Sequence, residues 1–260
     1  MIEHFKELYS YRALLSAFVV RDLKARYRHT SLGIAWAIIQ PLFLMFIFTL
    51  VFSYFFKVST GGPPYPIFSY VALLPWTFIS KTFSASGSKF VGSRGLISKI
   101  YFPREIIPFS IVLSGLVDFF FGSLVFIVML VYYQIPVSVS FLYLLLLLPT
   151  QIILATGLSL LGSVLTALFR DVEFAMPLFI QIWMYASPVI YSVRNLHERF
   201  RPFFYINPAT GILDGYRDSI ILGRNPDFGF LITSFLISVA TFFIAYWLFK
   251  RLEYLVVDIL

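Results

Sequence analysis

Residues 21–48 read RDLKARYRHTSLGIAWAIIQPLFLMFIF, a cluster of positive charges followed by a long apolar run. No charged residue occurs from position 31 to position 56, a stretch of 26 residues. About 20 apolar residues suffice to cross the roughly 30 Å hydrocarbon core of a bilayer. The run is too long for a signal-peptide core and no small-residue cleavage site follows it, so we expect it to be retained as a transmembrane helix.

The composition of the whole chain agrees with a membrane protein. Of the 260 residues, 59% are hydrophobic and only 13% are charged, and the mean hydropathy is +0.86. Soluble domains contain about half apolar and a quarter charged residues. We therefore predict an all-α integral membrane fold with six transmembrane helices, at about 32–56, 64–82, 106–133, 139–168, 174–193 and 229–249.

The basic residues are distributed unevenly between the two sides of this predicted bundle. Fourteen of the 20 Lys and Arg residues fall on the side that holds both termini, and six on the other. The positive-inside rule therefore predicts a multi-pass protein of the cytoplasmic (inner) membrane with both termini in the cytoplasm. Because the cations flank the spans, the net charge of +7 does not indicate nucleic-acid binding. The absence of cysteine excludes disulfides and thiolate chemistry.

Residues 1–30 predict an amphipathic helix lying in the cytoplasmic membrane interface before the first span, with a solvated basic tail as the alternative. One side of the helical wheel is apolar and another is cationic. The two sides comprise Leu8, Leu15, Val19 and Leu23, and Lys6, Arg21, Lys24 and Arg28.

Two connections on the cytoplasmic side carry features beyond those of simple linkers. The loop at 83–104 is rich in Ser, Gly and cations and ends in a short amphipathic piece around Leu96, Ile97, Ile100 and Tyr101, before Pro103 breaks the chain. This piece is either a docking element for a cytoplasmic partner or an ordinary interfacial helix. The second connection is the short turn LFRDVEF at 168–174.

The outer connection at 194–227 is the longest one. Asn207 followed by Pro208 predicts a helix start, and Gly223 predicts its stop. Such a helix suits a gate or lid on the outer surface, and equally a static cap.

Polar groups inside the predicted spans are few. Asp118 is the one acidic residue well inside a span, where a functional role and a packing hydrogen bond with Ser114 or Ser123 are both open. Two aromatic stripes also carry amides, a combination that suits the apolar faces and hydroxyls of sugar rings, although membrane-interface belts also explain some of these aromatics. The stripes comprise Trp36, Gln40, Phe43 and Tyr54 in the first span, and Phe174, Gln181 and Tyr185 in the fifth.

The sequence holds no phosphate-binding loop of the form G-x-x-x-x-G-K-[ST], no H-E-x-x-H, no G-x-S-x-G and no Cys/His cluster. We therefore expect no enzyme, no metal and no cofactor in this chain. Any nucleotide energy has to be supplied by another subunit.

Four segments together resemble the transmembrane subunit of type-2 ABC exporters of polysaccharides, the Wzm and TagG group that exports O-antigen or teichoic acid. They are RDLKARYRHTSLGIAWAIIQPLF, LISKIYFPREIIP, FRDVEFAMPLFIQIWMYASPVIYS and INPATGILDGYRDSIILG. The resemblance implies a homodimer with two cytoplasmic ATPase subunits that hold ATP and Mg²⁺. It also implies a channel at the dimer interface and a substrate linked to an undecaprenyl lipid carrier, within a six-helix domain spanning 31–260.

The resemblance also implies roles for particular residues. A coupling helix and a second turn would contact the ATPases, with Arg94, Gly95, Leu96, Ile97, Lys99, Ile100, Tyr101, Arg170 and Asp171. The channel would use the two aromatic stripes, and the outer gate Asn207, Pro208, Tyr216 and Arg217. The cations of the interface helix would contact the ATPase and anionic lipid pyrophosphate, namely Arg21, Lys24, Arg26 and Arg28.

The sequence leaves three alternative functions open. A related type-2 exporter of drugs or small lipids would share the fold. A proton-coupled secondary transporter needs paired intramembrane charges, for which Asp118 alone is thin support. A membrane glycosyltransferase needs acidic residues clustered at one membrane face, whereas the cytoplasmic acids here are scattered.

Overall fold

The computed structural model describes residues 9–28, 30–97 and 99–259, and these form helices joined by short connections, without strands. The predicted interface-helix residues Lys6 and Leu8 lie outside the described residues. The α-helices are α2 (Arg12–Tyr27), α3 (Trp36–Phe48), α4 (Tyr65–Gly92), α5 (Arg94–Ile97), α6 (Ile106–Tyr132), α7 (Leu144–Leu168), α8 (Asp171–Tyr185), α9 (Arg201–Tyr205), α10 (Pro208–Tyr216) and α11 (Phe228–Ile259). Two of them continue into wider π-helical turns, α3 into Thr49–Phe55 and α10 into Arg217–Ile221.

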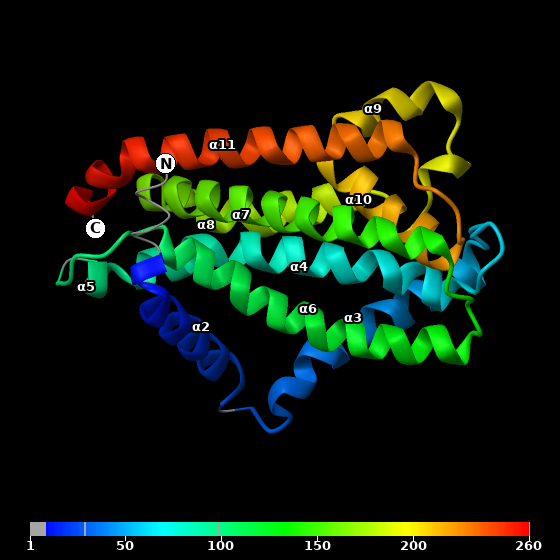
Figure 1. The fold of residues 1–260 in the computed structure, drawn as a ribbon, viewed down its shortest axis with the longest axis horizontal. Coiled ribbons are helices and arrows are strands. Elements are labelled where there is room, and N and C mark those ends of the chain that lie inside the picture. The colour runs from blue at the N-terminus through cyan, green and yellow to red at the C-terminus, as the bar shows by residue number, and fades with distance from the viewer. Residues whose placement is uncertain (1–8, 29, 98, 260) are drawn as a thin grey trace.

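Helix α4 is the centre of the bundle. It packs against α3, α6, α7, α8 and α10, and most of its residues are buried (Figure 1). Helix α11 lies along α7 on one side. Helix α2 packs against α6 and forms a V with α3. Helix α5, the turn between α7 and α8 and the end of α11 lie at one end of the bundle, while α9 and α10 lie at the other.

Helix α4 continues ten residues beyond the predicted span end at 82, so the Ser- and Gly-rich segment is helix and the connection to α6 begins only at Ser93. Small residues there let α7 approach closely: a Cβ on Gly87 would lie 2.1 Å from Thr166 Oγ1. Ser163 Oγ donates to the Ser86 carbonyl at 3.2 Å. The composition that suggested a loop instead serves tight helix packing, as in many membrane bundles.

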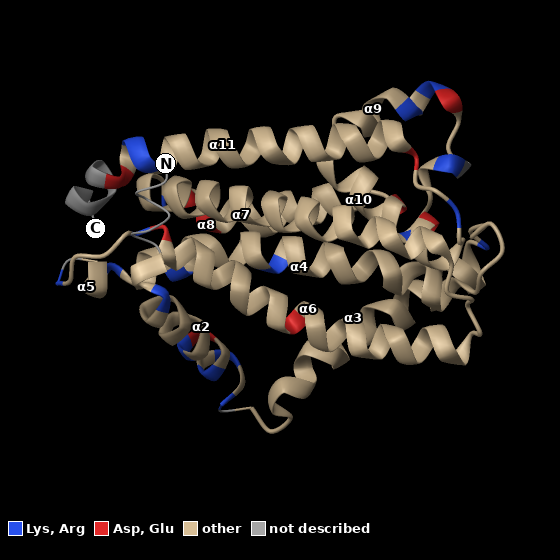
Figure 2. Cartoon of the chain, in the orientation of Figure 1, with Lys and Arg blue, Asp and Glu red and all other residues tan. Residues whose placement is uncertain are grey.

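Four helical segments of the described chain are long and apolar enough to cross a membrane: Gly33–Phe55, Ile106–Tyr132, Val139–Leu168 and Phe228–Glu253. They coincide with the predicted first, third, fourth and sixth spans. Helix α4 has the length, but Ser, Thr and Lys residues lower its hydropathy, and α8 has only 15 residues. Charged residues gather mainly at the two ends of the bundle (Figure 2), as a transmembrane arrangement requires.

Candidate functional site

Helix α2 is bound to the bundle by charged and aromatic contacts. Arg26 forms an ion pair with Asp118 of α6, and Tyr27 Oη donates to the same carboxylate at 2.7 Å. Further toward the helix start, Lys89 Nζ of α4 lies 2.8 Å from Asp22 Oδ2. Phe18, which is buried, packs on Phe102. Helix α2 therefore follows the bundle surface over most of its length.

These contacts identify the partners of Asp118. The two serines considered as its packing partners donate elsewhere, Ser114 to the Ile111 carbonyl and Ser123 to the Phe119 carbonyl. The true partners lie more than 90 residues earlier in the chain. Burial and the hydrogen bond to Asp118 raise the pKa of Tyr27 to about 12, so the phenol stays protonated and remains a donor.

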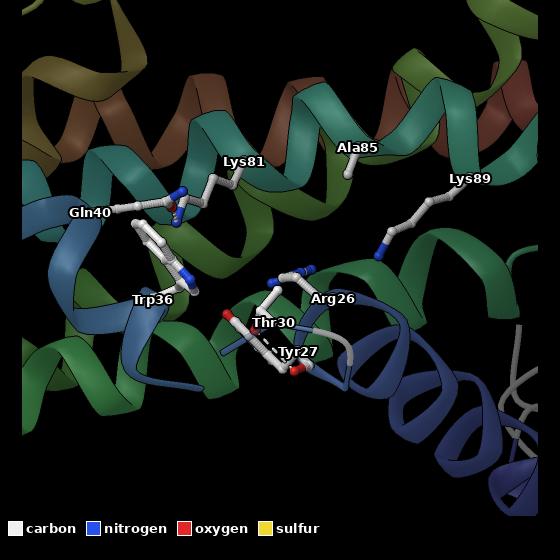
Figure 3. A pocket seen from close by; sticks show the side chains of 8 residues that line it. All are labelled: Arg26, Tyr27, Thr30, Trp36, Gln40, Lys81, Ala85 and Lys89. Atoms are coloured by element: carbon white, nitrogen blue, oxygen red, sulfur yellow. Dashed lines mark hydrogen bonds between the residues drawn. The ribbon is translucent and has the colours of Figure 1, made fainter. Parts of the chain in front are cut away.

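A cavity of about 460 Å³ opens where α2, α3 and α4 meet; we call it the cationic cavity. Figure 3 shows its side chains converging from the three helices and the α2–α3 connection on one space. Its charged lining residues are all positive. The lining comprises Arg26, Tyr27, Thr30, Trp36, Gln40, Lys81, Ala85 and Lys89.

The structure separates the four cations expected to contact lipid headgroups. Arg26 faces the cationic cavity, whereas Arg21, Lys24 and Arg28 are exposed and line a different, shallow hollow on α2. That hollow also contains small and apolar residues such as Val20. Of these four cations, only Arg26 lines a cavity together with cations of another helix, Lys81 and Lys89 of α4. Lys81 and Lys89 were missed as site residues. A lysine within a span is itself a sign of function, and Lys81 lies inside the predicted span at 64–82, whereas Lys89 lies beyond it.

The two aromatic stripes lie on exposed faces of α3 and α8. Residues from α3, α4 and α8, including Phe48, Trp76 and Trp183, form one cluster, so the two helices flank the same side of α4. Their other faces are unpartnered in the single chain, and all seven predicted channel residues are exposed there. These residues are Trp36, Gln40, Phe43, Tyr54, Phe174, Gln181 and Tyr185.

The first of the predicted coupling residues form a short four-residue helix, α5. The backbone N–H groups of Lys99 and Ile100 donate to the Leu96 carbonyl, so a turn follows α5. Ile97 is buried against the cluster that contains Phe90 and Phe249, and it anchors α5. Ile100 and Tyr101 are 58% and 81% exposed and face outward. Arg94, Gly95 and Lys99 are exposed and Leu96 is half-buried, while Arg170 and Asp171 are exposed at the α7–α8 turn of the same bundle end.

The predicted helix start at Asn207–Pro208 is confirmed. Asn207 Oδ1 accepts from Ala209 N at 3.0 Å and from Trp183 Nε1 at 2.9 Å, while Pro208 occupies the first turn. Gly223 has a φ of +58°, as its predicted role as a stop requires. Helix α10 is buried from Ala209 to Tyr216, so the prediction that it lies at a surface is wrong.

Arg217 fixes α10 and its π turn to the rest of the bundle. The guanidinium is buried, pairs with Asp214 at 3.0 Å and lies over the ring of Phe68. It also donates to four backbone carbonyls, those of Phe68, Pro188, Val189 and Tyr191. The neighbouring Asp218 binds both Arg194 and Arg224, at 2.7 and 2.8 Å. The predicted gate residues Tyr216 and Arg217 are thus interior ones, with Tyr216 also buried.

No group of three or more His, Cys, Asp or Glu residues within the described ranges could hold a metal ion. At the end of the bundle that carries α5, Lys250 of α11 bonds Glu105 at 2.8 Å, which ties the start of α6 to the chain end.

Comparison with known proteins agrees with this arrangement. The sequence profile of the family described as ABC-2 type transporter matches residues 13–221. An O-antigen export system permease protein RfbA of Myxococcus xanthus is 29% identical over 230 residues, 87% of each chain. A protein of the same name from Klebsiella pneumoniae is 27% identical over 95% of each chain, and the polysialic acid transport protein KpsM of Escherichia coli is 21% identical over 82% of this chain and 83% of KpsM. The profile covers most of the chain, which therefore belongs to the ABC-2 type transporter membrane family.

Proposed function

We propose that this chain is the transmembrane subunit of an ATP-driven polysaccharide exporter. Its substrate is a glycan of O-antigen or teichoic-acid type on an undecaprenyl carrier, moved outward across the cytoplasmic membrane. The observation that carries the proposal is the exposed aromatic face of α3 and α8, in a chain whose relatives are named for polysaccharide export and transport.

Six spans complete the proposed topology, with α4 and α8 joining the four long apolar helices. Twenty-eight residues give α4 a length of about 42 Å. Because neighbouring helices cover most of it, its polar residues do not need to face lipid. Both termini then lie in the cytoplasm, on the side favoured by the excess of Lys and Arg.

A homodimer gives the exposed face of α3 and α8 a partner. Gln40 and Gln181 are exposed there, and the Gln40 oxygen accepts from Lys81. An amide group that faces hydrocarbon without a hydrogen-bonding partner is costly. Between two copies the same face lines a water-filled channel, where the amides bond sugar hydroxyls. Exposed rings such as Phe43 and Tyr185 then stack on the apolar faces of successive sugars without selecting one residue.

Two ATPase subunits dock on the end of the bundle that carries α5 and the α7–α8 turn. Ile100 and Tyr101 present apolar surface there beside exposed Arg94, Arg170 and Asp171. ATP and Mg²⁺ bind to the partner subunits, and the permease converts their movement into opening of the channel.

Deletion of the gene in its own host tests the function. We expect lipid-linked polymer to accumulate in the cytoplasm and to be missing from the cell surface, with recovery on complementation. Normal surface glycan without internal accumulation, in a host with no second exporter, would contradict polysaccharide export and favour a drug or small-lipid substrate.

A further inference from the structure

The cationic cavity has an excess of positive charge. Three of its lining residues are cations. Two of them form ion pairs with carboxylates that do not line the cavity, Arg26 with Asp118 and Lys89 with Asp22. The third cation, Lys81, donates to the neutral amide oxygen of Gln40 at 2.7 Å. No ion pair within the described ranges includes Lys81, so the cavity carries one net positive charge.

A half-buried lysine between helices is stabilised when a counter-ion neutralises it. The nearby Asp118 is already bound by Arg26 and Tyr27, which are held in place by α2. Three cations from two helices surround one space, which is the arrangement expected for a multiply charged anion such as a phosphate or diphosphate. The volume of about 460 Å³ lies in the range of small-molecule sites.

The remaining lining indicates that the anion carries an organic group. Trp36 and Tyr27 provide ring surfaces, and Thr30 and Gln40 provide hydrogen-bonding groups, all facing the space between the cations (Figure 3). Trp36 and Gln40 also belong to the exposed face of α3. The cavity therefore opens directly onto the start of the proposed channel, so a ligand held by its phosphates would have its sugar at the channel entrance.

We propose that the cationic cavity binds the phosphate groups of the lipid-linked substrate, with Lys81 and Arg26 as the main phosphate ligands and Trp36 against the first sugar. This inference rests on the proposed function, because it assigns the charged end of the same substrate. The exposed cations Arg21, Lys24 and Arg28 then contact the headgroups of the surrounding bilayer instead.

Binding to the purified permease in nanodiscs of neutral lipid tests the site, with undecaprenyl diphosphate as the probe. Inorganic pyrophosphate, undecaprenol and phosphatidylglycerol are measured beside it. We expect undecaprenyl diphosphate to bind best and Lys81→Gln to weaken it about 10-fold or more, since a charge-assisted hydrogen bond is lost. Lys81→Arg should keep most of the affinity. Lys57→Gln, which removes an exposed charge outside the cavity, should match the wild type.

Several results would overturn the assignment. Equal affinities of Lys81→Gln and wild type would leave the Lys81–Gln40 bond as a packing contact only. Equal binding of phosphatidylglycerol would make the cavity a site for bulk phospholipid, and equal binding of pyrophosphate alone would make it a site for a free anion.

Export in the host separates this inference from the proposed function. If deletion abolishes surface glycan while Lys81→Gln restores it fully, the cavity assignment fails and the exporter remains. If deletion leaves surface glycan unchanged, the exporter fails whatever the binding result.

Discussion

Single ion pairs decide how α2 is held on the bundle. Asp118 accepts from Arg26 and Tyr27, and so joins α2 to the middle of α6. The sequence alone predicts that a carboxylate inside a span needs a partner, but not which one. Its partners lie more than 90 residues away, and only tertiary packing brings them together.

Asp118→Asn should lower the free energy of unfolding of the purified protein by about 2 kcal/mol, because Arg26 loses a largely buried counter-ion. Arg26→Gln should lower the free energy of unfolding by a similar amount. The double variant should lose less than the sum of the two single losses. Thermal unfolding of the four proteins measures this coupling. If Asp118→Asn instead assembled normally and abolished all transport, a proton-coupled mechanism would replace the ATP-driven one.

Substitution of Arg217 should lower the stability more than substitution of Asp118, because Arg217 donates to four backbone carbonyls and to Asp214 at once. Arg217→Met should destabilise the protein by about 3–5 kcal/mol, and Arg217→Lys should recover only part of this because an ammonium cannot reach the same set. Thermal unfolding gives the values. Arg224→Gln, at a 42% exposed side chain, is the matched control and should cost at most about 1 kcal/mol. Equal losses at the two positions would contradict the central role of Arg217.

At the scale of elements, glycines set how closely α7 approaches its neighbours. A Cβ on Gly157 would lie 2.9 Å from the backbone N and Cα of Phe242 in α11, and a backbone cannot rotate away. Gly157→Ala should therefore destabilise by about 1–3 kcal/mol. Gly92→Ala, where nothing lies within 4 Å, serves as the control in the same unfolding measurement. Similar stability of both variants would mean that α7 and α11 are not tightly packed.

The proposed docking of the ATPase depends on the exposed residues that follow α5. Ile100→Asp with Tyr101→Asp should abolish co-purification of the ATPase, because these exposed side chains present the apolar surface for docking. Changing Ile97 would test the fold instead, since it is buried. Val137→Asp, at an exposed position in the connection between α6 and α7, should leave co-purification intact. A retained ATPase in the Ile100/Tyr101 variant would exclude the segment as the docking element.

Element boundaries follow from the sequence where local chemistry sets them. The Asn207–Pro208 start and the Gly223 stop depend on neighbouring backbone groups, and both are where the sequence predicts. The end of α4 is different, because its Ser and Gly residues are suited equally to a loop and to tight packing. Only the presence of α7 decides between them. Likewise, Arg26 lines the cationic cavity while the other α2 cations do not, and this depends on where α4 lies.

For the whole molecule, hydropathy and charge bias predict a helical membrane bundle, and the packing then leaves one face of α3 and α8 without a partner. Phe43→Ala and Tyr185→Ala should slow glycan export more than they lower the amount of protein in the membrane, because each removes a stacking surface. Surface glycan per permease molecule is the measurement. Val128→Ala, at a similarly exposed position on α6, should have no such effect. Equal export by all three variants would make the two aromatics packing residues.

The most direct test of the exporter is ATP-driven transfer of lipid-linked polysaccharide into inverted membrane vesicles that contain the permease and its ATPase. We predict that the glycan becomes protected from an added glycosidase only when ATP is present, and that Phe43→Ala and Tyr185→Ala slow this protection. If the glycan stays accessible with ATP present, while a small lipid or drug becomes protected, polysaccharide export by this chain would be contradicted.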